Sequence, residues 1–350
     1  MASQSPAFHA VKIWVSHLCD LFIGVRQTST AIVWYTLPIV ILILAPIGVF
    51  KTVEDRAMVR FILLFLWRYY RFFVLLFFFW RYTAAKPLTS RTVYPKDATI
   101  IIPTVSVSKN TFFEECLTKC LINQPGAVEV VTATKDDATK VNTLLSEINE
   151  KIRTGKSEFT SGVVDISEID VRVNYTGIPN KRVQIAFALP NVRTRLVVLI
   201  DDHVFLKPRF LVAALLPFED KDVGLCGTKK VVRRITSTSY WKSVWNVLGA
   251  LYLTRHNFEI RATNAQDGGA FVISSRAAII LAEIVQDPKF IEQFTNERFF
   301  FRTFGPLNPD DDNFITRWVV KHSKRYEVKF QDTEDATIET TLGEYPKFLA

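Results

Sequence analysis

Two apolar stretches near the N-terminus differ from the rest of the chain. Residues 31–50 carry no formal charge and are long enough to cross the hydrocarbon core of a bilayer as a helix. Pro38 and Pro46 would kink such a helix without forbidding it. A cleaved signal peptide does not fit, because the run begins too far from the N-terminus and no small-residue cleavage pattern follows it. We predict a membrane span at 31–50 after a cytosolic segment, 1–30; a buried helix of a soluble protein is the alternative.

The second stretch, residues 61–80, is mostly Phe, Leu, Ile and Val but contains Arg68 and Arg71. Each apolar residue favours insertion by roughly 0.3–0.6 kcal/mol, and each arginine at mid-helix costs about 2.5–3.5 kcal/mol, so the balance is close to zero. A tilted second span and an interfacial helix both fit this balance. Basic residues follow the stretch: Arg81, Lys86, Arg91 and Lys96. This positive flank ends the predicted membrane segment, 31–83, and places the downstream chain on the cytosolic side of a plasma membrane or endomembrane.

From about residue 97 the pattern changes to alternating strands and helices. Apolar runs predict strands at 98–105, 128–134, 163–175, 195–202, 270–274 and 336–341. Amphipathic spacing predicts helices at 111–124, 136–152, from Lys181, from near Pro208 and at 313–322; Thr111 and Glu114 would form a capping box for the first of these. Such alternation indicates an α/β fold with a mostly parallel sheet, whose ligands bind at the carboxyl ends of the strands. The predicted domain covers residues 97–350.

Composition narrows the class of protein. Hydrophobic residues make up 49% and charged residues 22% of the 350 residues, which excludes a disordered chain. Four cysteines exclude a disulfide scaffold, so Cys116 and Cys120 are expected to be a buried, reduced pair. Much of the net charge of +8 flanks the apolar stretches, which favours anionic membrane lipids over nucleic acid as the partner. No GxGxxG follows the first strand, and the Gly-Lys-Ser at 155–157 follows a helix, so neither dinucleotide-binding nor phosphate-loop motifs are present.

Two acidic clusters are candidates for chemistry. Asp201, Asp202 and His203 close the strand 195–202, where carboxylates can hold a hard divalent cation that neutralises a nucleotide diphosphate. Capping of the helix near Pro208 is the alternative. The triplet 310–312 precedes the helix 313–322, and one of its carboxylates could serve as a general base or merely cap that helix.

Two further motifs allow a functional and a structural interpretation. Gly268 and Gly269 lack side chains, which lets a ligand approach the backbone, although an ordinary tight turn explains them equally well. Lys181 and Arg182 open a helix, where the helix dipole does not favour positive charge. A contact with a diphosphate would explain this pair, and a solvated surface pair is the alternative.

The order of these motifs resembles that of a known enzyme family. A membrane run is followed by IIPTV, VVTATKDD, NKR, LIDDHV, DGGAFVISSR and DDDNFITRW. This order resembles the membrane-embedded family-2 glycosyltransferases, the group of cellulose, chitin and hyaluronan synthases. It looks most like the fungal hyaluronan-synthase-like polysaccharide synthases, over a match from about residue 30 to the C-terminus.

The resemblance implies a GT-A fold and an inverting transfer of a sugar from a UDP-sugar to a growing polysaccharide, with Mg²⁺ or Mn²⁺ as cofactor. It implies that Thr104, Asp136 and Asp137 lie near the uridine, and that Lys181 and Arg182 lie near the diphosphate.

The metal motif departs from the family pattern, which places two carboxylates with one residue between them. Aligning Asp202 and His203 with the family's Asp-His form leaves Ile200 at the first carboxylate position, whereas aligning from Asp201 makes His203 the third member. The resemblance therefore implies Asp202 as the first metal ligand, ahead of His203, with Asp201 beside the cofactor.

On the acceptor side, the resemblance implies that Gly268, Gly269 and Asp311 line the acceptor terminus and that Asp312 is the catalytic base. The Thr-Glu-Asp sequence at 333–335 spells one family variant of the base motif. It leads into a predicted strand rather than a helix, so we reject it.

The family follows its base with a Gln-x-x-Arg-Trp motif and further membrane helices. This sequence ends at LGEYPKFLA, where that motif should be about to begin, so the resemblance implies a truncated member. Two alternatives stay open: a non-processive transferase that uses a lipid acceptor, and a non-catalytic relative that binds UDP without transferring sugar.

Overall fold

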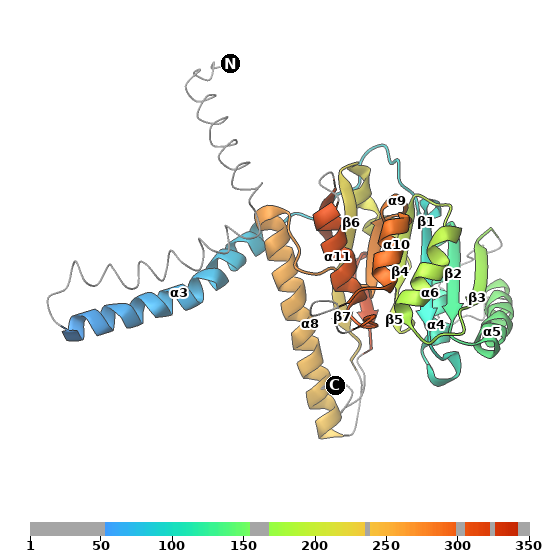
Figure 1. Ribbon diagram of the computed structural model, residues 1–350, viewed down its shortest axis with the longest axis horizontal. Helices are drawn as coiled ribbons and strands as arrows, with labels where there is room; N and C mark the ends of the chain where they lie inside the picture. The colour runs from blue at the N-terminus through green and yellow to red at the C-terminus, as the bar shows by residue number, and fades with distance from the viewer. Residues whose placement is uncertain (1–52, 155–167, 235–238, 299–304, 323–325, 342–350) are drawn as a thin grey trace, which may run out of the picture. The chain divides into compact units, whose positions relative to one another are not determined.

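The computed structural model describes residues 53–154, 168–234, 239–298, 305–322 and 326–341 (Figure 1). The predicted span 31–50 and the segment 1–30 lie outside the described residues. The chain divides into two compact units, Met1–Leu76 and Phe77–Ala350.

A single long helix, α3 (Val53–Arg81), contains the second apolar stretch. Its part Asp55–Arg81 is long and apolar enough to cross a membrane, and only 6% of its most apolar window is buried within the protein. Exposed side chains along it include Phe61, Phe65 and Phe73. The helix predicted at 61–80 is therefore confirmed, and its length suits either a span or an interfacial helix.

A mixed sheet forms the centre of the second unit. Within the described residues, seven strands pair in the order β3-β2-β1-β4-β8-β6-β9. All neighbours are parallel except β8, which runs antiparallel to both β4 and β6. The strands are β1 (Ala98–Thr104), β2 (Ala127–Thr132), β3 (Asp170–Tyr175), β4 (Leu196–Ile200), β6 (Val223–Thr228), β8 (Ala277–Leu281) and β9 (Glu327–Gln331). Strands β1, β2, β4, β6 and β8 are buried along their whole length, as expected for strands covered on both faces.

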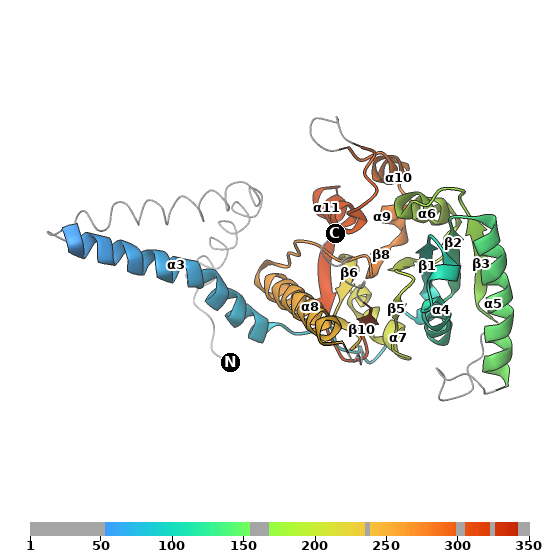
Figure 2. The ribbon, with the colours of Figure 1, turned by 90° about the horizontal axis from the view of Figure 1, so that it is seen from below.

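Helices cover both faces of this sheet. Figure 2 shows α6, α10 and α11 on one face and α4 and α7 on the other. The helices are α4 (Phe113–Ile122), α5 (Lys135–Arg153), α6 (Lys181–Ala188), α7 (Phe210–Ala214), α8 (Tyr240–Asp267), α9 (Ala282–Val285), α10 (Pro288–Thr295) and α11 (Asp311–His322). Short 3-10 turns lie at Pro95–Asp97, Val107–Lys109, Leu189–Asn191 and Leu216–Glu219. The α/β class with a mostly parallel sheet and flanking helices is thus confirmed.

A small second sheet holds the last described strand. It has the order β5-β10-β7, from β5 (Val204–Phe205), β10 (Ile338–Thr340) and β7 (Lys230–Val232). Strand β10 pairs antiparallel with β5 and parallel with β7. Chain segments that leave β4 and β6 are therefore fixed by a strand from near the C-terminus.

Two local predictions were wrong. The predicted strand 270–274 is irregular; the strand comes later, as β8, because its wholly apolar sequence AAIIL fits the buried position between β4 and β6. The capping box of Thr111 and Glu114 does not form, since α4 has Phe112 at its N-cap without a side-chain cap. The Oδ1 atom of Asn110 instead accepts a hydrogen bond from the Phe112 amide at 3.0 Å.

The segment that follows α3 is fixed to strand β9. The Gln331 side chain forms two 3.0 Å hydrogen bonds with the backbone of Ala85, one to its N–H and one to its carbonyl. Tyr82 donates a hydrogen bond to the Phe330 carbonyl. Arg261 on α8 donates to the Phe79 carbonyl at 3.0 Å and pairs with Asp332 at 2.8 Å. Within the second unit, residues 79–85 are therefore held by hydrogen bonds to β9 and α8.

Candidate functional site

The site lies where β1 and β4 end side by side. Thr104 is the last residue of β1, and Asp201 and Asp202 directly follow β4. The Thr104 hydroxyl donates to Asp202 Oδ2 at 2.7 Å, and Asn110 Nδ2 donates to the Asp202 carbonyl at 2.8 Å. Thr104 therefore holds the Asp202 carboxylate and Asn110 holds its backbone, so Asp202 has a fixed position at this edge of the sheet.

Asp202 and His203 provide two donors that suit a divalent cation. His203 Nδ1 lies 3.2 Å from Asp202 Oδ1, and the two side chains remain 33% and 23% exposed. No group of three His, Cys, Asp or Glu side chains that could hold a metal occurs among the described residues. Mg²⁺ commonly binds through one or two carboxylates plus the phosphates of its substrate. The pair therefore fits a cation that shares its shell with a bound phosphate, and does not fit a fully protein-bound metal.

Lys181 joins the two acidic clusters. Its Nζ lies 2.7 Å from Asp201 Oδ1 and 3.0 Å from Asp311 Oδ2, and it also donates to the Ser275 hydroxyl at 2.8 Å. Burial alone lowers the pKa of Lys181, but Asp201 and then Asp311 raise it above its usual value, so this lysine stays charged. The pKa of Asp201 is raised by burial but held below its usual value by Lys181. Asp201 is thus neutralised by Lys181, which leaves Asp202 as the carboxylate beside His203.

Asp312 lies beside this cluster at the start of α11. Burial, and then the charge of Asp311, raise the pKa of the Asp312 carboxyl above its usual value. Its Oδ1 accepts a 2.8 Å hydrogen bond from the Asn313 amide. A half-buried carboxylate with a raised pKa and no ion pair at 4.0 Å or less among the described residues is suited to accept a proton.

Arg182, the neighbour of Lys181, lies in the protein interior. It is 1% exposed, and its guanidinium donates to the carbonyls of Phe294 and Pro309 at 3.0 and 2.8 Å. The same group pairs with Glu297 at 2.8 Å and lies over the rings of Phe294 and Phe314. These contacts tie α6 to α10 and to the segment before α11, so they account for Arg182 without a ligand.

The two aspartates of the second motif have different surroundings. Asp137 is buried at the start of α5, where it accepts from the Thr134 hydroxyl at 2.8 Å and from the Val107 amide at 3.3 Å. The Thr134 hydroxyl in turn accepts from the Asp137 amide at 3.1 Å, so Thr134 caps the N-terminus of α5. Asp136 is exposed. Asp137 therefore fixes the loop after β1, on which Asn110 lies.

The two glycines end helix α8. Gly268 is its C-cap, with a left-handed φ of 69°, and its amide donates to the Asn264 carbonyl at 3.0 Å. A Cβ added at Gly268 would meet nothing within 4 Å. Helix termination thus explains Gly268, since glycine adopts this conformation without strain.

Sequence reasoning missed two basic residues that lie beside the site. Lys230 is 3% exposed and begins β7, and Arg276 directly precedes β8. Both belong to sequences that look like ordinary surface charge, and only the pairing of β4, β8 and β6 brings them to this edge. The one signal in the sequence is that Lys229 and Lys230 come directly after the uncharged stretch VGLCGT.

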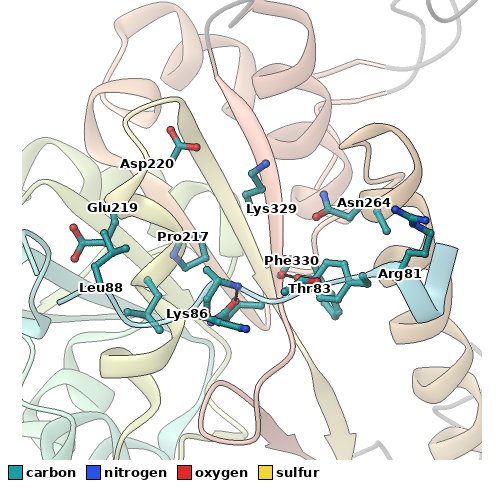
Figure 3. Close-up of a pocket in the computed structure, with 15 residues that line it drawn as sticks. Arg81, Thr83, Lys86, Leu88, Pro217, Glu219, Asp220, Asn264, Lys329 and Phe330 are labelled. Atoms are coloured by element: carbon teal, nitrogen blue, oxygen red, sulfur yellow. Dashed lines mark hydrogen bonds between the residues drawn. The ribbon is translucent and has the colours of Figure 1, made fainter. Parts of the chain in front are cut away.

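A separate cavity of about 670 Å³ lies between the segment after α3 and strand β9 (Figure 3). Figure 3 shows Thr83 and Lys86 on that segment, with Lys329 and Phe330 on β9. None of the candidate site residues lines this cavity. It is therefore distinct from the acidic site.

Comparison with known proteins points to one family. The family description "Glycosyltransferase like family 2" matches residues 95–332. A "Type 2 glycosyltransferase" from Pyricularia oryzae is 33% identical over 83% of this chain and 55% of its own length. A "Type 2 glycosyltransferase" from Gibberella zeae is 35% identical over 81% of this chain and 49% of its own length. This chain spans about half the length of the curated relatives that it matches.

A solved structure is similar at lower identity. The mannosyltransferase PcManGT from Pyrobaculum calidifontis, in complex with GDP-Man and Mn²⁺, has a TM-score of 0.48 and 16% identity. The similarity covers 80% of this chain and 68% of that protein.

Proposed function

This chain belongs to glycosyltransferase family 2, and we propose that it is a membrane-bound inverting enzyme that moves a sugar from a UDP-sugar to a growing polysaccharide, as the hyaluronan-synthase-like members do. One observation carries the proposal: Lys181 bridges Asp201 and Asp311. This bridge brings the end of β4 and the start of α11 into one site, so a donor-binding carboxylate and a basic carboxylate can act on the same bound sugar.

On the donor side, Asp202 and His203 would hold Mg²⁺ or Mn²⁺ together with the diphosphate of the UDP-sugar. Such a cation supplies charge neutralisation for the departing UDP. Thr104 holds the Asp202 carboxylate in place through its 2.7 Å hydrogen bond. Asp136 and Asp137 would border the uridine at the start of α5.

Lys181 adds a positive charge to the donor side. Its ammonium would face the diphosphate while it remains paired with Asp201 and Asp311. Arg182 is omitted from this proposal because its guanidinium is already bound to two carbonyls and to Glu297. Lys181 would thus contact the ligand, whereas Arg182 stabilises the fold.

On the acceptor side, Asp312 would act as the general base. Its carboxylate takes the proton of the acceptor hydroxyl as the hydroxyl oxygen forms a bond to the anomeric carbon, and the bond from that carbon to UDP breaks. Attack from the face opposite UDP inverts the anomeric configuration. Asp311 and the backbone at Gly268 and Gly269 would border the acceptor terminus.

Attachment to a membrane is supported by two exposed apolar surfaces. Helix α3 has the length and composition of a span, and the N-terminal part of α8 exposes Tyr240, Trp241, Leu251 and Tyr252. Aromatic side chains of this kind are enriched at the interface between lipid and water. The basic residues after α3 support a cytosolic position for the catalytic domain, where it would meet UDP-sugars and anionic lipids. In this proposal, nucleic acid is not a partner.

The test is sugar transfer by the detergent-purified full chain, with Mn²⁺ and a panel of radiolabelled UDP-sugars. We expect UDP release and a polymeric product from one donor, and at least a 100-fold loss in Asp312→Asn. Asp335→Asn is the matched control, because Asp335 belongs to the rejected Thr-Glu-Asp motif and its side chain is 47% exposed beside Arg209. Loss in Asp335→Asn with full activity in Asp312→Asn would reverse the assignment of the base. Product size separates polymer synthesis from transfer of one sugar to a lipid.

A further inference from the structure

Two basic side chains lie beside the site without a carboxylate partner. No ion pair of 4.0 Å or less joins Lys230 or Arg276 to any other described residue, whereas Lys181 has two such pairs. Arg276 Nε is buried and has no hydrogen-bond partner in the described part of the chain. A buried cation without a partner is costly, so its presence calls for an explanation.

The strand register places this basic pair (Lys230 and Arg276) together. Ile200 lies opposite Ala277 and Gly227 lies opposite Ala278, so β8 is flanked by β4 and β6 at this point. Asp201 therefore follows β4 next to Arg276, and the chain that leaves β6 passes Arg276 on its way to Lys230. Three strand ends thus meet beside the carboxylates of the proposed active site.

Other contacts hold Lys230 and the neighbour of Arg276 in place. Asn257 on α8 accepts from the Lys230 amide at 3.1 Å and donates to the Lys230 carbonyl at 2.6 Å. The Lys230 Nζ atom lies 3.2 Å from His256 Nδ1, within hydrogen-bonding distance. Next to Arg276, the Ser275 hydroxyl accepts from Lys181. Lys230 is therefore held within the fold, and the residue before Arg276 is fixed to Lys181.

We propose that Lys230 and Arg276 form a binding position for a phosphoryl oxyanion of the substrate, beside Asp312 and apart from the metal position at Asp202. This inference rests on the proposed function. Buried Lys230 and half-buried Arg276 carry like charges that repel each other in the free protein. A phosphate between them removes the repulsion and satisfies Arg276 Nε. The oxyanion comes from the diphosphate of the donor or from a phosphate on a lipid acceptor.

The charges around Lys230 give a consequence that does not require mutation. Burial, and then Arg276, lower the pKa of Lys230 to about 7, against the smaller opposite effects of Asp312 and Asp201. Burial, then Lys230 and Arg276, lower the pKa of His256 to about 3, so His256 stays neutral. A group with a pKa of about 7 is only about 10% protonated at pH 8. Binding of an oxyanion at pH 8 should therefore take up roughly 0.9 proton, and much less at pH 6.

The experiment measures binding to the detergent-purified full chain by calorimetry, in buffers that differ in ionisation enthalpy. The probes are UDP, uridine and farnesyl phosphate, and the variants are Lys230→Met, Arg276→Met and the control Lys229→Met. If the donor supplies the oxyanion, both test variants lower the affinity for UDP at least 10-fold and leave the affinity for uridine unchanged. If the acceptor supplies it, both variants lower the affinity for farnesyl phosphate by the same factor and leave the affinity for UDP unchanged. Lys229→Met, with the same change of charge one residue earlier, should bind every probe normally.

The proposed oxyanion position is overturned if both variants fold and bind every probe with unchanged affinity. It is also overturned if the wild type binds at pH 8 without taking up a proton. The proton measurement uses the wild type alone, so it holds even if a variant fails to fold. Sugar transfer measured on the same wild-type preparation separates this inference from the proposed function. Active wild type with unaffected variants contradicts only the oxyanion position, whereas oxyanion binding without any transfer contradicts only the proposed activity.

Discussion

Replacing Arg182 by Met should destabilise the protein without weakening nucleotide binding. The guanidinium loses two carbonyl acceptors and its pair with Glu297, and it leaves contact with the rings of Phe294 and Phe314. Removing one member of a buried ion pair costs about 3–5 kcal/mol. Glu297 keeps its pair with Arg317, which favours the lower part of this range. Since a domain of this size loses about 2–4 °C per kcal/mol, we expect the melting temperature to fall by roughly 6–20 °C.

The assay is a thermal melt in detergent, combined with UDP binding in the cold, where the variant remains folded. The matched control is Arg193→Met, because Arg193 is exposed and its loss should change stability by less than about 0.5 kcal/mol. Lys181→Met provides the contrast, since loss of that ammonium should weaken the binding of UDP. If Arg182→Met melts like the wild type and binds UDP at least 10-fold more weakly, the structural role of Arg182 is refuted. Arg182 would then be a ligand of the diphosphate.

Three further predictions concern the site itself. The transfer rate should rise with pH through the pKa of Asp312, which is raised, so the acidic limb of the pH–rate profile should lie above the usual carboxyl range; a limb within that range contradicts its role as base. Lys230→Met should stabilise the protein at pH 7, because the pKa of Lys230 falls from its usual 10.5 to about 7 in the folded state. The wild type therefore gains stability as the pH rises from 7 to 10.5. The advantage of this variant should shrink by up to about 1.4 kcal/mol per pH unit from 7 to 9, and an advantage independent of pH would show that Lys230 is not buried as a base. Chelation should abolish transfer and Mn²⁺ should restore it, whereas Asp202→Asn should need at least 10-fold more Mn²⁺ for half-maximal rate; an unchanged requirement would remove Asp202 from the metal position.

The elements that sequence predicted best are those with an unambiguous apolar run. The strands at 98–105 and 195–202 appear as β1 and β4, because a strand buried on both faces needs continuous apolar sequence. The strand at 270–274 was wrong, although AFVIS has a strand-like composition. The neighbouring AAIIL fits between β4 and β6, and this competition depends on tertiary pairing that no local pattern contains.

The site was predictable where a residue's position along a strand decides its place. Thr104 ends β1 and Asp202 comes just after the neighbouring parallel strand β4, and a hydrogen bond joins the two side chains. Lys181 and Arg182 are adjacent in sequence and were expected to share one role, yet successive helix positions point in different directions. Lys181 meets the carboxylates and Arg182 meets the aromatic side chains of α10 and α11. Lys230 was missed because burial of one lysine in a basic run is decided by strands distant in sequence.

The position of β9 at the end of the sheet order has a consequence for synthesis of the protein. Strand β9 completes the pairing of β6, and it is made long after β1. At about 5–20 residues per second, a ribosome needs roughly 5–20 s from the end of β6 to the start of β9. During that interval β6 presents an unpaired edge and the apolar positions that Val328 and Phe330 later cover. The yield of folded protein should therefore depend on chaperones that shield this edge in the nascent chain.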